Sequence, residues 1–247
     1  MKNNKTSLLP NILLALAVLT LIATAIIVFG AALGLWQPIT GFGYYRSYGS
    51  YLGYFASVLA IISLIFALVQ RTKVNSLKAL FTIAIGMVLV SPTLITQFKP
   101  PVSYPPIHDI TTNPENPPAF TFLTDDRPGA RNSLIYGGDE VAQLQQQAFA
   151  DIQPIMTTTT PEQAFEKAKQ VAKAMKWEIV YQSQQELRFE ASAQTPYFHF
   201  TDDIVVLVST EDNGSRIDIR SVSRIGRGDR GVNAKRIRSF IEKYNDA

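Results

Sequence analysis

The first 98 positions of the chain contain three long runs of apolar residues. These runs cover residues 12–35, 51–69 and 79–98, and none of them includes a charged residue. A helix needs roughly 20 apolar residues to cross the hydrocarbon core of a bilayer, whereas a helix on a soluble domain keeps a polar face. The pattern therefore predicts three transmembrane helices within residues 1–98, the third with a proline, Pro92, that can kink it.

The start of the first run is similar to a secretory signal peptide. Lys2 and Lys5 precede it, and Ala23-Thr24-Ala25 is typical of a cleavage site. The apolar run continues for about ten residues beyond that site, which is longer than the apolar region of a signal peptide. We therefore expect an uncleaved membrane anchor rather than a leader that is removed.

Basic residues in the short connections predict the orientation of the spans. The N-terminal tail and residues 70–78 carry five lysines and arginines, whereas the other side carries Arg46 and Lys99. Lysine and arginine concentrate on the cytoplasmic side of membrane proteins. We expect a multi-pass protein of the bacterial inner membrane, with a cytoplasmic N-terminus and a periplasmic or extracellular C-terminal domain.

The connection between the first two spans, residues 36–54, is rich in glycine, tyrosine and phenylalanine. We expect it to form an aromatic belt at the membrane interface. A loop that binds a ligand through its aromatic rings is the alternative.

Composition changes abruptly after the third span. Residues 99–118 contain seven prolines and are predicted to be an extended linker. Residues 119–247 then form a predicted extracytoplasmic α+β domain. All 20 acidic residues and 17 of the 23 basic residues follow position 98, so this part of the chain has a net charge of −3. The small overall positive charge is thus no sign of nucleic-acid binding.

Within the soluble part, periodicity predicts a helix, a four-stranded antiparallel sheet and a final helix. Thr160 and Gln163 form a capping box that starts an amphipathic helix over residues 161–175. Asn213-Gly214 predicts a tight turn between the last two strands. A weaker pattern in residues 119–150 predicts a short helix over 139–149, and this segment is expected to cover the second face of the sheet. The expected strands lie at 177–182, 187–193, 204–208 and 216–220, and the final helix at 232–244.

Several stretches of the soluble part resemble a known bacterial family. They are residues 217–234, His108-Asp109-Ile110-Thr111-Thr112, the Asn116-Pro117-Pro118 step, and Thr195-Pro196 to Asp202-Asp203. The resemblance is to the domain of unknown function 1499 family and covers roughly residues 105–245. It implies an envelope or secreted protein and carries no activity, so no catalytic residue follows from it.

Charge is also segregated within the soluble part. Residues 216–247 contain nine basic and four acidic residues, in contrast to eight and 16 in residues 99–215. A glycine-rich loop that precedes a helix exposes backbone N–H groups, and forked guanidinium groups beside them favour an anion. The alternative is a structural network in which Asp202 and Asp203 pair with Arg220 and Arg224. The residues proposed to bind a ligand or partner are Thr195, Phe198, Asp202, Asp203, Arg220, Ser223, Arg224, Arg227, Asp229 and Asn233.

Recognisable catalytic motifs are absent from the sequence, and so are cysteines. We therefore expect no catalytic residues, no cofactor and no metal site. The predicted function is a membrane-anchored envelope module that binds an anionic lipid headgroup, a glycan or another envelope protein. An enzyme that acts on an anionic substrate through His199, Asp202 and Asp203, or a subunit of a membrane complex, remains the alternative.

Overall fold

The computed structural model describes residues 8–99 and 102–246. Lys2, Lys5, Pro100 and Pro101, on which parts of the sequence interpretation rest, lie outside this part of the chain. The chain divides into two compact units, Met1–Val102 and Ser103–Ala247. The second unit therefore includes most of the stretch that its prolines mark as a linker.

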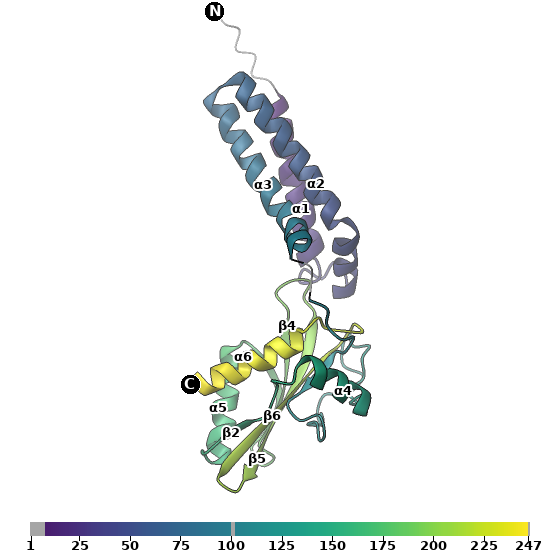
Figure 1. The fold of residues 1–247 in the computed structure, drawn as a ribbon, viewed down its shortest axis with the longest axis vertical. Coiled ribbons are helices and arrows are strands. Elements are labelled where there is room, and N and C mark those ends of the chain that lie inside the picture. The colour runs from purple at the N-terminus through teal and green to yellow at the C-terminus, as the bar shows by residue number, and fades with distance from the viewer. Residues whose placement is uncertain (1–7, 100–101, 247) are drawn as a thin grey trace, which may run out of the picture. The chain divides into compact units, whose positions relative to one another are not determined.

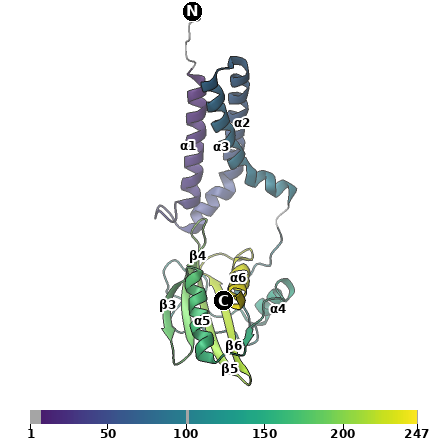
Figure 2. The same cartoon turned by 90° about the vertical axis from the view of Figure 1, so that its left-hand side faces the viewer.

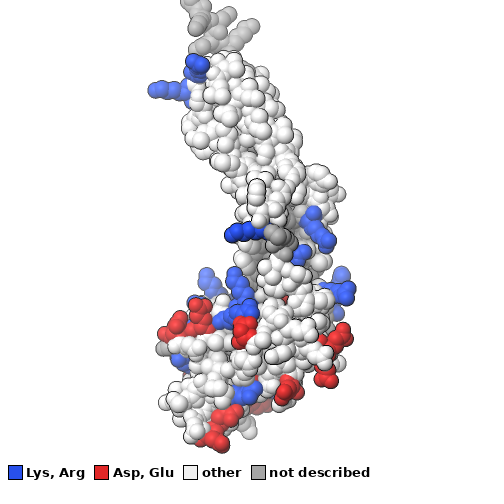
Figure 3. All heavy atoms as spheres, viewed as in Figure 1, with Lys and Arg blue, Asp and Glu red and all other residues white. Residues whose placement is uncertain are grey.

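The first unit consists of three long helices that pack side by side (Figure 1). They are α1 (Leu9–Phe29), α2 (Pro38–Gln70) and α3 (Lys73–Phe98), and each is long and apolar enough to cross a membrane. The face drawn in Figure 3 is white along most of this unit, with basic residues only toward its ends. The predicted number of apolar helices is confirmed.

The boundaries of all three spans differ from the predicted ones, and the third helix begins at Lys73 instead of residue 79. The first helix ends at Phe29, and the second already begins at Pro38, so most of residues 36–54 is helix rather than a connecting loop. Pro38 occupies the first helical position, where its missing N–H leaves no bond unmade. In apolar surroundings a backbone must satisfy its own hydrogen bonds, which favours helix even in a glycine-rich stretch.

Small residues allow α2 and α3 to approach closely. A Cβ atom added at Gly53 would lie 2.7 Å from the carbonyl oxygen of Leu89, and one added at Gly86 would lie 3.1 Å from that of Ala56. Side chains without bulk let two helix backbones pack directly in a bilayer, where no hydrophobic effect drives helices together. Backbone contact at Gly53 and Gly86 thus sets the packing of this pair.

The second unit contains an antiparallel sheet of six strands instead of the predicted four. The path of the sheet is β1-β6-β5-β4-β3, and β2 also pairs with β6, beside β1 on the same edge. Each of these two extra strands has only three residues, and β1 lies in a proline-rich stretch, so neither shows an alternating pattern. The strands are β1 (Asp109–Thr111), β2 (Ile155–Thr157), β3 (Glu178–Ser183), β4 (Arg188–Gln194), β5 (Thr201–Glu211) and β6 (Gly214–Ser223).

Two helices, α5 (Pro161–Ala174) and α6 (Val232–Asp246), pack on one face of the sheet and bury the core (Figure 2). The predicted capping box is present at the start of α5, with both reciprocal hydrogen bonds. Apolar side chains of β4, β5 and β6 alternate toward these helices, for example Ile204 and Ile219. A shorter helix, α4 (Gly138–Ala148), anchors β1 through Gln145.

An irregular segment, residues 113–137, covers the opposite face of the sheet. It is held there by side chains of β4, β5 and β6, whose contacts are described below. The predicted cover of this face is confirmed, although it comes mainly from coil rather than from the helix near residue 140. We call residues 113–137 the covering segment.

The close contact at Gly53 gives a direct test of the α2–α3 packing. Gly53→Ala places a methyl group against the Leu89 backbone, so we expect the full-length protein in detergent to lose about 1–3 kcal/mol of stability. A thermal melt followed by circular dichroism measures this. Gly43→Ala, where no atom lies within 4 Å of the added carbon, is the matched control and should not lower the melting temperature. Equal melting of both variants would contradict the packing.

Candidate functional site

Charged side chains lie buried between the sheet and the covering segment. Successive side chains of a strand point to opposite faces, so Asp203 in β5 points away from the helices that Ile204 contacts. Glu190 of β4 and Arg220 of β6 lie on this same second face, on either side of Val205. Since a buried charge is costly unless it is paired, each of these groups needs a partner.

Asp203 is the centre of the first group of partners. Its carboxylate is fully buried and accepts hydrogen bonds from the Arg127 Nε at 2.5 Å and from the Arg224 Nη2 at 2.8 Å. The Ser192 hydroxyl donates a third at 2.8 Å. Arg224 also donates to the carbonyl of Pro128, so one carboxylate and two arginines join β4, β5, β6 and the covering segment.

Arg220 is the largest of the fully buried side chains and is only 2% exposed. Its guanidinium binds both oxygens of Asp109 on β1, at 3.0 and 2.7 Å. It donates further to the carbonyls of Pro118 and Leu134, and lies 5.4 Å from the ring centres of Phe120 and Tyr136. Burial, with an opposing contribution from Arg220, raises the pKa of Asp109.

Glu190 holds the covering segment through backbone groups. Its carboxylate accepts the N–H groups of Thr121, Phe122 and Leu123 at 2.6, 3.0 and 2.7 Å, and the Thr121 hydroxyl at 3.1 Å. No part of Glu190 is exposed. Three successive N–H groups around one carboxylate form a nest that binds the anion strongly in a water-free place. The segment at residues 121–123 therefore takes its conformation from a strand side chain.

Asp202 points to the helical face, opposite to its neighbour Asp203. It pairs with Arg236 of α6 at 2.5 Å, and Arg236 also donates to Asn233. Asn233 in turn connects to Ser221 and to Ser223 of β6. Asp202 and Asp203 are therefore parts of two separate networks and do not form one site with His199.

The loop before α6 uses its own carboxylate to satisfy its free backbone groups. Asp229 accepts the N–H groups of Gly231 and Asn233 at 2.9 and 2.6 Å. Burial raises the pKa of Asp229, while these two backbone hydrogen bonds oppose that rise. Two of the backbone donors that the sequence offered to an external anion are thus occupied, and Asp229 caps the start of α6 through the N–H of Asn233.

Three cations near this loop lack a counter-ion. Within residues 8–99 and 102–246, no carboxylate lies within ion-pair distance of Arg131, Arg227 or Lys235, and all three are exposed. Hydrogen bonds from the Arg131 and Asn132 N–H groups to the Arg224 carbonyl place Arg131 beside the loop. The loop itself packs on the start of the unit, because Gly231 touches the ring of Tyr104.

Thr195 and Phe198 lie in the turn between β4 and β5. Thr195 stabilises this turn through three hydrogen bonds. Its N–H donates to the carbonyl of Phe200, and its hydroxyl donates to the carbonyl of Tyr197 and accepts the N–H of Phe200. Phe198 and His199 adopt left-handed backbone conformations. The backbone carbonyl of Thr201, the first residue of β5, accepts the N–H of Arg224. The turn therefore adjoins the first residue of the arginine-rich loop.

Comparison with protein families matches residues 109–243 to a protein of unknown function family, DUF1499. The match spans more than half of the chain. The chain belongs to the DUF1499 family. No curated protein matches the chain. The expected resemblance is confirmed, and the matched region contains the whole buried network of the second unit.

The stretch that carries the family resemblance, residues 217–234, has a structural explanation. Arg220, Ser221, Arg224, Asp229 and Asn233 each bond a residue of another segment or cap α6. In this DUF1499 unit these polar residues thus maintain the fold. Arg227, by contrast, belongs to the same stretch and pairs with no carboxylate of the described residues.

A small hollow of about 380 Å³ opens above Arg220 in the DUF1499 unit. The covering segment forms its walls, including Phe120, Leu134 and Tyr136. The Tyr136 hydroxyl is buried without a hydrogen-bond partner among the described residues, and burial followed by the charge of Asp109 raises its pKa to about 12. No group of three His, Asp or Glu residues in the described part could hold a metal ion.

Sequence reasoning missed four members of these networks: Asp109, Arg127, Glu190 and Arg236. Glu190 is one of the polar residues that alternate with apolar ones along its strand. Alternation alone predicts that such a residue faces solvent. Arg127 lies in a segment with no periodicity, so no local signal marks it. Only the long-range pairing of the covering segment with the sheet reveals both residues.

Glu190→Gln tests whether the carboxylate holds the covering segment. The amide offers one acceptor and brings a donor against backbone N–H groups, so we expect a loss of roughly 2–3 kcal/mol in unfolding free energy. Urea unfolding of the full-length protein in detergent, followed by tryptophan fluorescence, measures it. Glu186→Gln is the matched control, because that side chain is half exposed, and it should stay within about 0.5 kcal/mol. A stable Glu190→Gln protein would contradict this role.

Proposed function

We propose that this DUF1499 protein is a membrane-anchored binding module of the bacterial cell envelope. Three helices hold it in the inner membrane, and the second unit lies on the periplasmic or extracellular side. That unit presents Arg131, Arg227 and Lys235 to an anionic ligand or partner. The proposal depends on one observation, which is that these exposed cations have no counter-ion among the described residues of the unit, 103–246.

The composition of the first unit supports the membrane placement. Its helices expose leucine, isoleucine and valine over most of their surface, which is unfavourable in water. Residues 1–98 contain no acidic residue, and Arg71 and Lys73 lie where α2 connects to α3. Basic residues at this connection favour a cytoplasmic location for it, and hence the opposite side for the end of α3.

The buried network distinguishes arginines that are paired inside the fold from cations that stay exposed. The charges of Arg127, Arg220, Arg224 and Arg236 are already neutralised by carboxylates inside the fold. Such pairs are expensive to separate, so these side chains have little freedom to bind an external anion. The exposed cations can bind an anion without breaking any internal pair.

The enzyme alternative finds less support in this geometry. Its proposed acids, Asp202 and Asp203, point to opposite faces of the sheet, and each binds an arginine. A general acid or base must reach the same reacting atoms as its partner groups. We therefore favour binding over catalysis for this unit.

Neutralising the three exposed cations should abolish anion capture without unfolding. We expect Arg131→Ala/Arg227→Ala/Lys235→Ala to lose at least tenfold in affinity for fluorescent polyphosphate, measured by anisotropy on full-length protein in phosphatidylcholine nanodiscs. The thermal melt should remain that of the wild type.

The matched control removes three exposed lysines elsewhere in the same unit: Lys173, Lys176 and Lys243. This triple alanine variant should keep most of the affinity. An equal loss in both triple variants would show that net charge, and not this surface, attracts the polyanion. Crosslinking in intact cells from a photoreactive residue at position 227, with one at position 173 as reference, then reports the natural partner.

Reporter fusions test the proposed orientation. Alkaline phosphatase is active only outside the cytoplasm, so we expect high activity when it follows residue 246 and low activity when it follows Thr72. The reverse pattern, or equal activity at both positions, would rule out this arrangement of the spans.

A further inference from the structure

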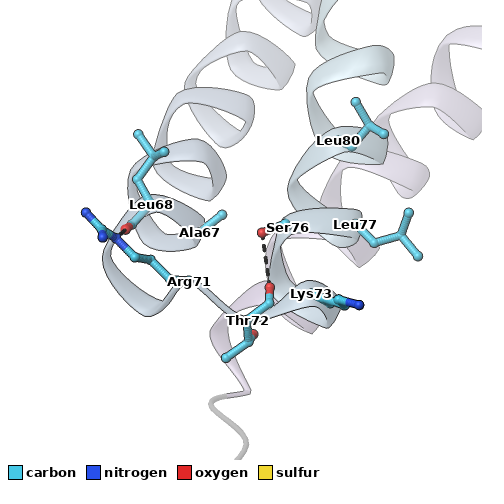
Figure 4. Close-up of a pocket in the computed structure, with 8 residues that line it drawn as sticks. All are labelled: Ala67, Leu68, Arg71, Thr72, Lys73, Ser76, Leu77 and Leu80. Atoms are coloured by element: carbon cyan, nitrogen blue, oxygen red, sulfur yellow. Dashed lines mark hydrogen bonds between the residues drawn. The ribbon is translucent and has the colours of Figure 1, made fainter.

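The connection between α2 and α3 borders an open hollow of about 860 Å³ (Figure 4). Arg71 and Lys73 line one end of it, and Leu68, Leu77 and Leu80 line the two helices leading away from that end. The hollow therefore combines positive charge at the tip of the hairpin with apolar side chains along the helices.

The backbone of the connection holds its two basic residues apart. Arg71 takes a left-handed conformation, with φ of 48°, that ends α2, and its Nε donates to the Leu68 carbonyl at 3.3 Å. Thr72 then caps α3 through the N–H of Asn75 at 3.3 Å. Figure 4 shows Arg71 on the side of α2 and Lys73 on the side of α3, so the two cations flank the hollow.

These two charges have no counter-ion in their own unit. The sequence up to Phe98 contains no Asp or Glu at all, so no residue there can pair with Arg71 or Lys73. The next lysine along α3, Lys78, differs because its Nζ donates to the side-chain oxygen of Asn11 at 2.5 Å. The negative charge that balances Arg71 and Lys73 must therefore come from outside this unit.

The leucines restrict the kind of anion that fits. Leu68, Leu77 and Leu80 are 63%, 55% and 60% exposed in the unit alone. An inorganic anion would neutralise the basic end and leave these side chains uncovered. A phospholipid supplies a phosphate and acyl chains in one molecule, in the order in which the hollow presents cations and leucines.

We infer that the hollow binds an acidic phospholipid, with the headgroup at the end that Arg71 and Lys73 flank and the first acyl segments along the leucines. This inference rests on the proposed membrane placement of the helices, but not on the proposed binding surface of the second unit. A basic residue near an anionic lipid strengthens binding by roughly fivefold, so two residues should give more than a tenfold preference.

Lipid retention by the full-length protein tests the inference. The protein in dodecyl maltoside receives equal amounts of phosphatidylglycerol and phosphatidylcholine, and native mass spectrometry measures the bound lipid. We expect at least tenfold more phosphatidylglycerol on the wild type, and a loss of that preference in Arg71→Ala/Lys73→Ala. The soluble headgroup, glycerophosphoglycerol, should not displace the lipid at equal concentration.

Arg46→Ala/Lys99→Ala is the matched control. It removes one basic residue from α2 and one at the end of α3, far along both helices from the connection. We expect it to keep the preference, and an equal loss in both double variants would overturn the inference.

An absence of preference in the wild type, or full displacement by the soluble headgroup, would also overturn it. If Arg71→Ala/Lys73→Ala loses its helical circular dichroism, Arg71→Gln/Lys73→Gln replaces it. Failure of the membrane placement is distinguishable, because the chain would then be recovered from cells without detergent.

Discussion

Two arginines from different parts of the chain meet at Asp203, and the second unit depends on this buried pairing. Arg127 comes from the covering segment and Arg224 from the end of β6, and their shared carboxylate lies on the central strand β5. Leaving one of these charges alone in the interior would cost several kcal/mol, so the three groups must assemble together. Glu190 and Arg220 extend the same constraint along the sheet. A coil segment can cover this face because charge pairs and backbone hydrogen bonds replace the apolar contacts that helices make on the other face.

This constraint also determines which cations remain available for function. An arginine-rich stretch suggests an anion site. Arg220 and Arg224, however, already pair with carboxylates inside the fold. Asp229 also accepts the backbone N–H of Asn233 at the start of α6. What remains is a smaller surface, Arg131 with Arg227 and Lys235. The loop beside these residues packs on Tyr104, at the start of the unit.

The first unit follows a different physical rule, since it has no acidic residue and its cations cannot be neutralised internally. Its helices associate through close backbone contact at Gly53 and Gly86 instead of through ion pairs. Two of its basic residues, Arg71 and Lys73, lie where α2 ends and α3 begins. The arginines of the two units therefore differ in their pairing: the second unit buries several of them against carboxylates, whereas the first has no carboxylate side chain to pair with Arg46 or Arg71.

Local chemistry in the sequence was sufficient to predict the three apolar helices, the capping box at Thr160 and Gln163, and a tight turn between the last two strands. The turn residues are Asp212 and Asn213, one position before the predicted pair, because Gly214 already pairs with Glu211 as the first residue of β6. These features depend on residues close together in the chain, or on a long apolar run that needs no partner to be recognised. The short strands β1 and β2, the helical start of α2, and the roles of Arg127 and Glu190 required the tertiary structure. The helical start of α2 follows from the need to satisfy backbone hydrogen bonds in apolar surroundings. The other features depend on contacts between distant segments: Asp109 pairs with Arg220 and Thr121 with Glu190, and no periodicity along the chain encodes such a pairing. The sequence thus determined where the apolar surface lies, whereas only the folded chain decided which charges are paired in the interior and which stay exposed.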